Sequence, residues 1–146
     1  MSVLLTVSLS ATLPLSAASH VDVVKMRTEN QVNPLGIGTS TPRFSWQITS
    51  DRKGVVQTSY QILVASSREK LDRNEADLWD SGERNSDEQL WIPYQGKALL
   101  SGAQAYWKVR ITTNRGKSEW TEPQLFTIGL LGETKWSGTW IGLEDL

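Results

Sequence analysis

The feature that most constrains the fold of this chain is a repeated alternation of apolar and polar residues, which begins near residue 20. A period of two residues places successive side chains on opposite faces of a β-strand, so each alternating run predicts a strand with one buried face. Pro, Gly, Asn and Asp gather between the runs, as they do in turns. The predicted strands centre on residues 21–25, 43–48, 56–64, 78–79, 90–94, 106–111 and 126–128.

These short strands predict an all-β fold. No strand is followed by a long helical pattern, so a parallel sheet is not favoured, and about seven strands joined by turns are best accommodated in two antiparallel sheets packed face to face. Only one short helix is expected, over residues 67–73, where Ser66 and Glu69 have the spacing of a capping box. The alternation places Trp46 and Trp107 in the core.

Two strands carry specific expectations about burial. In residues 56–64, every second side chain from Val56 to Val64 is expected on the buried face, and Gln57 on the other. In residues 106–111, the odd-numbered positions are expected in the core and Lys108 on the opposite face.

Residues 1–18 differ from the rest because they contain no charged side chain and a long apolar stretch. Ser16 and Ala18 are small residues at the positions that a signal peptidase reads, with cleavage before Ser19. We therefore expect a signal peptide over residues 1–18 and a secreted or periplasmic protein. A buried N-terminal helix or strand is the alternative. A membrane-spanning helix is disfavoured, because the stretch is shorter than the ~20 residues that a bilayer requires.

The composition excludes several kinds of active site. The chain has no Cys and a single His, His20, which excludes disulfides, thiolate nucleophiles, His-based triads and multi-His metal sites. The net charge of −1 gives no reason to expect nucleic acid or an anionic membrane. Basic residues interleave with the acidic residues of 69–88, which is typical of a solvated loop, and residues 72–77 have Asp77 where a calcium loop needs Gly. No catalytic residue, cofactor or metal is expected.

The seven Trp residues provide the candidate contact sites. Trp91 is out of phase with its apolar neighbours, so it is expected to be exposed, where it could stack on a sugar or contact a neighbouring domain. Trp79 is a second candidate for such a contact. Packing of Trp91 beneath a loop is an equally good interpretation. Trp120 is expected to hold the last loop in place, whereas Trp136 and Trp140 lie beyond the predicted sandwich.

Several short segments are distinctive when they are taken together. They are residues 29–37 (ENQVNPLGI), 41–46 (TPRFSW), 57–66 (QTSYQILVAS), 78–82 (LWDSG), 94–96 (YQG), 106–110 (YWKVR) and 136–141 (WSGTWI). In this order and spacing they resemble the N-terminal region of bacterial α-L-rhamnosidases, which are secreted enzymes of glycoside hydrolase family 78. The resemblance covers about residues 25–141.

The resemblance implies an immunoglobulin-like sandwich of the fibronectin type III kind over residues 19–129. Residues 130–146 would be a linker and the start of a further β-domain. In such enzymes a helical (α/α)6 barrel carries the acids that release terminal L-rhamnose, and none of these acids maps onto this chain. One departure concerns the tyrosine corner. The Tyr is expected two residues before Trp107, but this position is Ala105, and Tyr106 is expected on the opposite face of the strand.

The resemblance therefore implies an accessory, non-catalytic domain of a secreted α-L-rhamnosidase, whose partners are the neighbouring domains of the parent enzyme and, through the parent, rhamnose-containing glycans. The alternative is a carbohydrate-binding module that uses exposed Trp91, with Trp79 as a second contact. A stand-alone adhesion domain is a third hypothesis, which the opening of a new segment at residues 136–146 disfavours.

Overall fold

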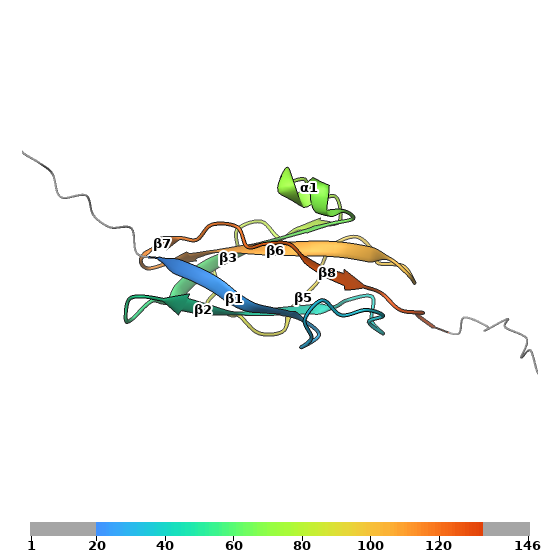
Figure 1. Cartoon of the computed structure of the whole chain (residues 1–146), viewed down its shortest axis with the longest axis horizontal. Coiled ribbons are helices and arrows are strands. Elements are labelled where there is room, and N and C mark those ends of the chain that lie inside the picture. Colours follow the sequence, from blue (N-terminus) through green and yellow to red (C-terminus); the bar gives the residue numbers. More distant parts are fainter. Residues whose placement is uncertain (1–19, 133–146) are drawn as a thin grey trace, which may run out of the picture.

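The computed structural model describes residues 20–132 and consists of two antiparallel sheets packed face to face (Figure 1). This confirms the predicted all-β sandwich. The predicted signal peptide and the residues Trp136 and Trp140 lie outside the described residues. Within residues 20–132, no helix has the length and apolar character needed to cross a membrane. The elements are β1 (Val21–Thr28), β2 (Arg43–Ser50), β3 (Gln57–Ala65), α1 (Arg68–Asp72), β4 (Trp79–Asp80), β5 (Ile92–Pro93), β6 (Gln104–Thr113), β7 (Gly116–Lys117) and β8 (Gln124–Thr127).

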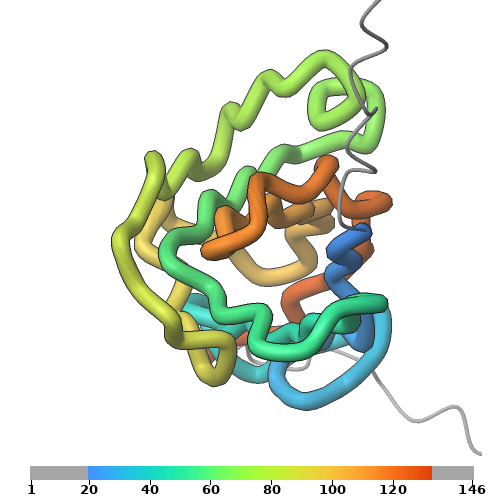
Figure 2. The backbone as a smooth tube through the Cα atoms, turned by 90° about the vertical axis from the view of Figure 1, so that its left-hand side faces the viewer, coloured from blue at the N-terminus to red at the C-terminus, as the bar shows by residue number. Residues whose placement is uncertain are grey.

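The sheets are organised around three long strands. In the three-stranded sheet, β2 lies between β1 and β5. In the five-stranded sheet, β3 and β6 pair over most of their length, with Ile62 opposite Val109 and Val64 opposite Trp107. The long connection from α1 to β5 crosses from one sheet to the other along one side of the sandwich (Figure 2). The described chain begins and ends at opposite ends of the long axis of the molecule (Figure 1).

Aromatic side chains from both sheets form the core. The ring of Phe44 in β2 lies 4.4 Å from that of Trp107 in β6. Trp46 and Trp107 are almost fully buried, as predicted. A buried indole N–H needs a hydrogen-bond partner, and both find one in the opposite sheet. Trp46 Nε1 donates to Gln57 Oε1 and Trp107 Nε1 donates to Thr28 Oγ1, each at 3.0 Å. These bonds tie the sheets together through the core.

The predicted burial at the start of β3 is wrong. Val56 is 53% exposed and Gln57 is buried, the reverse of the expectation. The cause is an irregularity in the pairing with β6 between Gln57 and Ser59, where an extra residue changes which face the side chains take. From Tyr60 to Val64 the predicted face is confirmed, because the pairing with β6 is regular there.

The predicted helix is present, but it is shorter and its cap differs. Ser67 is the N-cap, and its hydroxyl accepts a hydrogen bond from the backbone N–H of Lys70 at 3.4 Å. Ser66, the expected cap, instead donates its hydroxyl to Asp77 Oδ2 at 2.7 Å. Leu71 is buried in a small apolar cluster with residues of β3. This cluster attaches α1 to the outer face of the five-stranded sheet.

The two residues at the expected tyrosine corner, Ala105 and Tyr106, lie on opposite faces of β6, as the sequence predicts. Ala105 is fully buried and pairs with Phe126 of β8. Tyr106 is half-buried on the other face, and its hydroxyl accepts a hydrogen bond from Gln104 Nε2 at 2.6 Å. The hydroxyl of Tyr106 therefore contacts a side chain of its own strand rather than the upstream backbone that a tyrosine corner uses.

Candidate functional site

Two tryptophans lie on the outside of the sandwich, one on each sheet, and each contacts a cation. Trp91 lies next to Arg43 on the three-stranded sheet. Trp120 covers Lys108 and Arg110 on the five-stranded sheet. Aromatic rings beside cations occur both in ligand sites and in purely structural contacts. The burial and the hydrogen bonds of each cluster distinguish these two uses.

Trp91 directly precedes β5 and points away from the core. Its backbone N–H donates to Ser45 Oγ at 3.0 Å, which fixes the residue on the outer face of β2. Its indole is 45% exposed. Its φ is +59°, a left-handed conformation that is rare and strained for a bulky side chain. The fold therefore keeps a large aromatic residue at the surface at a conformational cost.

Arg43 covers the ring of Trp91, with its guanidinium carbon 4.3 Å from the ring centroid. Glu29 holds the guanidinium in place through two hydrogen bonds: Arg43 Nε donates to Oε1 at 3.0 Å and Nη2 donates to Oε2 at 2.8 Å. The hydrogen bond from Arg43 lowers the pKa of Glu29, against the opposing effect of burial. This bidentate pair orients the arginine, so that one part of the indole is occupied and the rest remains accessible.

A small hollow of about 140 Å³ adjoins Trp91. Its lining combines the indole and the apolar side chain of Leu90 with groups that donate and accept hydrogen bonds. Such a mixture is suited to the face and the hydroxyl groups of one sugar ring, but the hollow has no deep walls. The polar lining residues are Lys25, Arg27, Asn30, Ser45 and Gln47.

Trp79 occupies a different environment from Trp91. It is half-buried, and its ring stacks against Phe44 with the centroids 6.4 Å apart and meets Tyr94 edge-on at 5.5 Å. Phe44 points into the core, whereas Ser45, which binds the N–H of Trp91, lies on the outer face of β2. The two tryptophans are therefore on opposite sides of the three-stranded sheet and form no common surface.

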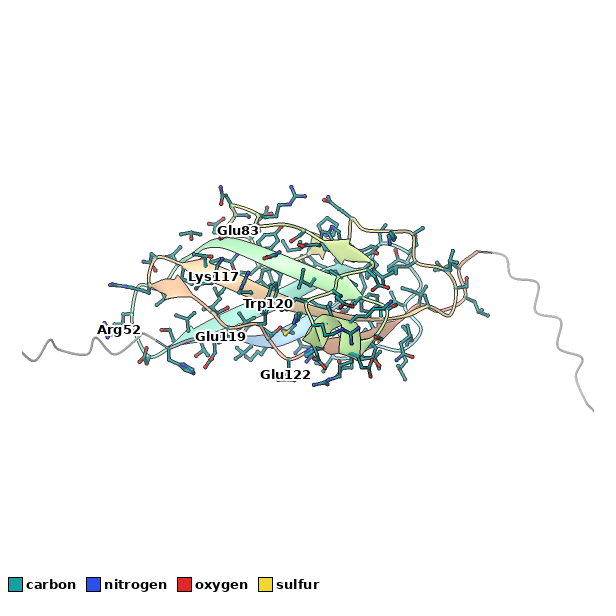
Figure 3. All side chains as sticks on the ribbon, turned by 90° about the horizontal axis from the view of Figure 1, so that it is seen from above. Arg52, Glu83, Lys117, Glu119, Trp120 and Glu122 are labelled. Atoms are coloured by element: carbon teal, nitrogen blue, oxygen red, sulfur yellow. The ribbon has the colours of Figure 1, made fainter. Side chains whose placement is uncertain are left out.

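The cluster around Trp120 covers the outside of the five-stranded sheet (Figure 3). The guanidinium carbon of Arg110 lies 4.4 Å and the Nζ of Lys108 lies 5.1 Å from its ring centroid. The two cations are two positions apart on β6, so both project from the same face of the strand toward the indole. The expectation that Trp120 holds the last loop agrees with this contact.

Lys108 is buried, although the alternation along β6 places its side chain on the face opposite the core. Its Nζ donates to the backbone carbonyl of Leu71, at the end of α1, and to Asn74 Oδ1 at 2.8 Å. Burial lowers the pKa of Lys108. One sequence signal for this second buried face is Leu63, which is apolar but alternates out of phase with the side chains of β3 that form the main core.

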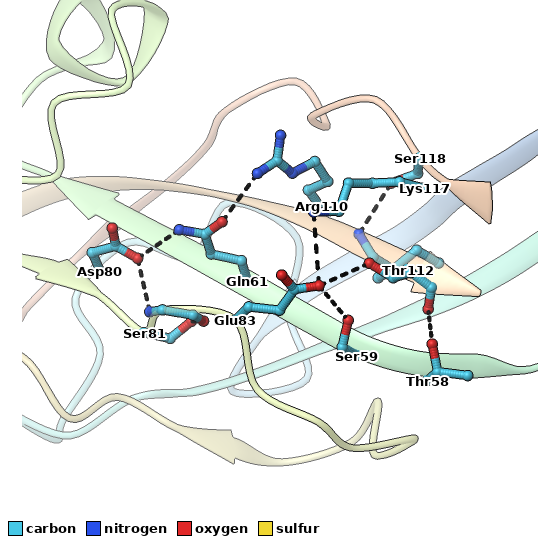
Figure 4. A network of polar contacts seen from close by, with 12 residues as sticks. Thr58, Ser59, Gln61, Asp80, Ser81, Glu83, Arg110, Thr112, Lys117 and Ser118 are labelled. Carbon is cyan, nitrogen blue, oxygen red and sulfur yellow. Dashed lines mark hydrogen bonds and ion pairs between the residues drawn. The ribbon is translucent and has the colours of Figure 1, made fainter. Parts of the chain in front are cut away.

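A polar network continues along the same face of the sheet (Figure 4). Gln61 bridges two charges, since its Nε2 donates to Asp80 Oδ1 at 2.9 Å and its Oε1 accepts from Arg110 Nη2 at 3.1 Å. Glu83 Oε1 accepts from Ser59 Oγ at 2.8 Å and from Thr112 Oγ1 at 3.1 Å. These contacts join the loop after β4 to β3 and β6, so their evident role is structural.

The acidic segment also lacks the features of a catalytic pair. Asp77 accepts hydrogen bonds from Lys70 Nζ at 2.6 Å and from Ser66. Burial alone would raise its pKa, but these bonds together lower it to about 2. A glycosidase acid needs a raised pKa, and hydrogen bonds lower the pKa of Glu75 and Glu83 as well. Among residues 20–132, no cluster of His, Cys, Asp and Glu could hold a metal ion.

Comparison with known proteins gives a consistent result. Residues 23–132 match the family model described as the Rha78A-like, N-terminal immunoglobulin domain. A protein of Formosa agariphila named alpha-L-rhamnosidase is 39% identical over 129 residues, which are 87% of this chain and 14% of that protein. An alpha-L-rhamnosidase of Streptomyces avermitilis is 37% identical over 84% of this chain and 12% of its own length. The chain thus spans about one seventh of these relatives.

Solved structures show the same fold. The crystal structure of Streptomyces avermitilis alpha-L-rhamnosidase complexed with L-rhamnose superposes with a TM-score of 0.77 and 36% identity, over 84% of this chain and 12% of that chain. The alpha-L-rhamnosidase from Dictyoglumus thermophilum superposes with a TM-score of 0.77 and 35% identity, over 84% of this chain and 14% of that chain.

Proposed function

The chain belongs to the family of Rha78A-like, N-terminal immunoglobulin domains, and from this membership we propose that it serves as a non-catalytic, structural domain of an α-L-rhamnosidase. The chain corresponds to only 12–14% of the length of such proteins. Its partners would be the other domains of the parent enzyme. The parent would hydrolyse terminal α-L-rhamnosyl groups and, if residues 1–18 act as a signal peptide, would work outside the cytoplasm.

The observation that supports a structural role is the state of the carboxyl groups. General-acid catalysis of glycoside hydrolysis needs a carboxyl group whose pKa is raised in a walled site. Here Asp77 and Glu83 are bound by hydroxyl and ammonium donors that lower their pKa. Asp77 joins its loop to α1, and Glu83 joins its loop to β3 and β6. These two acids thus act as hydrogen-bond acceptors that stabilise the fold.

The experiment is a turnover assay on the purified chain with an aryl α-L-rhamnoside. We expect the rate to equal that of a buffer blank at any protein concentration. Turnover that rises in proportion to protein, and that is abolished in a Glu83→Gln or Asp77→Asn variant, would refute the proposal. Circular dichroism of the same samples would establish that an inactive chain is folded.

A second candidate function, carbohydrate binding, is favoured by one observation at Trp91. This indole is 45% exposed at a strained φ of +59° and adjoins a hollow with polar walls. An exposed aromatic ring of this kind can stack on a sugar. Trp79 gives this function less support, because its ring is packed against Phe44.

Isothermal titration calorimetry with rhamnose-rich oligosaccharides separates the two functions. Binding heat that disappears in Trp91→Ala but persists in Val56→Ala would establish a carbohydrate-binding module. Val56 is a matched control, because it is an exposed apolar residue that does not line this hollow. The absence of heat with the folded chain leaves the structural role alone.

A further inference from the structure

The hollow beside Trp91 carries positive charge. Two of its lining residues, Lys25 and Arg27, are cations, and none of the described residues that line it is acidic. Within residues 20–132, neither cation forms an ion pair with a carboxylate. Arg27 Nη1 donates to the backbone carbonyl of Asn30 at 3.2 Å, and a guanidinium has further N–H groups to offer. The hollow is therefore complementary to an anionic group.

The carboxylate of Glu29, which follows β1, is already committed to Arg43. Its Oε1 accepts from the backbone N–H of Arg43 at 2.8 Å and from Nε at 3.0 Å, and its Oε2 accepts from Nη2 at 2.8 Å. A carboxylate bound in this bidentate way is directed at a single guanidinium. Within the described chain, the charge of Arg43 is thus balanced, whereas the charges of Lys25 and Arg27 are not.

An irregularity in β1 directs Arg27 to the outer face of the sheet. The pairing of β1 with β2 shifts register between Val24 and Arg27, where β1 contains an extra residue. Val23 packs against the core before this bulge, and Met26 is buried in the core after it. In a regular strand, the alternation from Val23 would instead point Arg27 into the core. The bulge therefore delivers the cation to the surface that carries the hollow.

The backbone is strained at the same hollow. Three of the residues that line it have a positive φ, which is +50° at Lys25, +64° at Asn30 and +59° at Trp91. Asn tolerates this left-handed conformation, but it is costly for Lys and Trp. Strain of this kind persists only where the surrounding structure imposes it, and it is concentrated at ligand sites. Strain, unbalanced charge and an exposed indole thus coincide at one place on the surface.

We propose that the Trp91 hollow binds a sugar residue that bears a carboxylate, such as a uronic acid. The sugar ring stacks on the exposed part of the indole, and the carboxylate accepts charge-assisted hydrogen bonds from Lys25 and Arg27. The side-chain amides of Asn30 and Gln47 line the same hollow and can bond the ring hydroxyls. An acidic side chain of another domain would satisfy the cations, but it has no ring face to cover the indole. The proposal rests on the second candidate function, carbohydrate binding, and narrows it to acidic saccharides.

The test is isothermal titration calorimetry of the full 146-residue chain with a trisaccharide of galacturonate and with its carboxyl-reduced counterpart. The two probes differ only in their carboxylates. We expect the acidic probe to bind at least about tenfold more tightly, because hydrogen bonds between charged groups are stronger than neutral ones. This preference should shrink in about 0.5 M NaCl, which screens the charges.

Charge-neutral variants identify the cations responsible. Lys25→Gln and Arg27→Gln should each weaken binding of the acidic probe by about threefold to tenfold and leave the carboxyl-reduced probe unaffected. Lys53→Gln is the matched control, because Lys53 is an exposed cation that does not line the hollow and its loss changes the net charge equally. Lys25 is itself exposed, so Lys25→Gln keeps the test decisive even if Arg27→Gln loses the bond to Asn30 and does not fold. Circular dichroism of each variant reports its folding.

The outcomes separate this proposal from the functions on which it builds. Equal affinity for the two probes, or an equal loss in Lys53→Gln, would overturn it and leave carbohydrate binding standing. Absence of heat with both probes would also overturn it, and the titration with rhamnose-rich oligosaccharides would then decide separately whether the hollow binds any sugar. None of these results bears on rhamnoside turnover, which tests the structural role.

Discussion

On the outer face of the five-stranded sheet, Trp120 covers two cations of β6, whereas on the outer face of the three-stranded sheet a cation covers Trp91. The components are alike but their surroundings differ. Lys108 is buried and bonded to the end of α1, while Trp91 is 45% exposed and its cation is held by a single carboxylate. The contrast teaches that burial of the cation, rather than the presence of an aromatic–cation pair, decides whether such a pair stabilises the fold.

Removal of each indole in turn is the strongest test of whether the two clusters differ in their contribution to stability. Trp120→Ala should lower the free energy of unfolding by about 3 kcal/mol, because it uncovers Lys108 and Arg110 together with the apolar cluster beneath α1. Trp91→Ala should cost less than about 1 kcal/mol, because much of its ring is already in water. Urea denaturation followed by circular dichroism measures both. Equal losses would show that the two clusters do not differ in the way proposed.

The second largest difference concerns the cations. Lys108→Ala leaves Asn74 Oδ1 without its donor and removes the charged donor of the Leu71 carbonyl, which then keeps only the N–H of Asn74, so it should cost about 2 kcal/mol. Arg43→Ala, the counterpart in the other cluster, removes an exposed cation and should cost about 0.5 kcal/mol. The same urea titrations apply. A smaller loss for Lys108→Ala than for Arg43→Ala would contradict the assigned roles.

Backbone strain at Trp91 provides a third test. Because φ is +59° there, Trp91→Gly should be more stable than Trp91→Ala by about 1 kcal/mol, although glycine has the more flexible unfolded chain. At Trp120, where no positive φ occurs, Trp120→Gly should instead be less stable than Trp120→Ala. Thermal melts of the four variants measure this. A less stable glycine variant at position 91 would mean that the strain is absent.

The loop that holds α1 over Lys108 should be sensitive to acid. The pKa of Asp77 is lowered from 3.8 to about 2, so its contribution to stability is complete above pH ~4 and is lost as the pH falls toward 2. Asp77→Asn should cost about 1 kcal/mol at pH 6, a modest value because both partners are partly exposed. The difference between the two proteins should vanish near pH 2 in urea titrations. A difference that does not change with pH would argue against the Lys70–Asp77 contact.

The smallest effect is expected at the exposed ion pair that joins α1 to the Trp120 segment. Arg68 Nη2 lies 2.8 Å from Glu122 Oε2, but the two side chains are 52% and 83% exposed. Arg68→Ala should change the free energy of unfolding by less than about 0.3 kcal/mol, because water and salt screen such pairs. A loss comparable to that of Lys108→Ala would show that this pair, and not burial of Lys108, attaches the helix.

Much of the sandwich was predictable from the sequence, and the residues show why. Trp46 and Trp107 are buried because they are in phase with the apolar residues of their own strands, which is a local property. The exposure of Trp91 agrees with its being out of phase with Ile92. The roles of Trp91 and Trp79 in binding stay predictions, although the core packing of Trp79 makes it the weaker candidate.

The predictions of burial in β3 and of the helix cap were wrong because contacts with residues elsewhere in the chain changed the local structure. The bulge in β3 reverses the burial of Val56 and Gln57, and it exists only in the pairing with β6. The cap moved from Ser66 to Ser67 because Asp77 binds Ser66. Neither partner is visible in an alternation pattern, since each depends on residues that are remote in the chain.

What the sequence determined by itself is the alternation, and with it the strands, the main core and the family. Period-two patterning fixes which side chains can share a face, whatever packs against that face. What only the tertiary structure decided is the use of the outer faces. Lys108 is buried because α1 folds over it and because Trp120 covers it from the other side. The carbonyl that Lys108 binds belongs to Leu71, which lies 37 residues earlier in the chain. Such a contact depends on long-range packing, which no local period encodes.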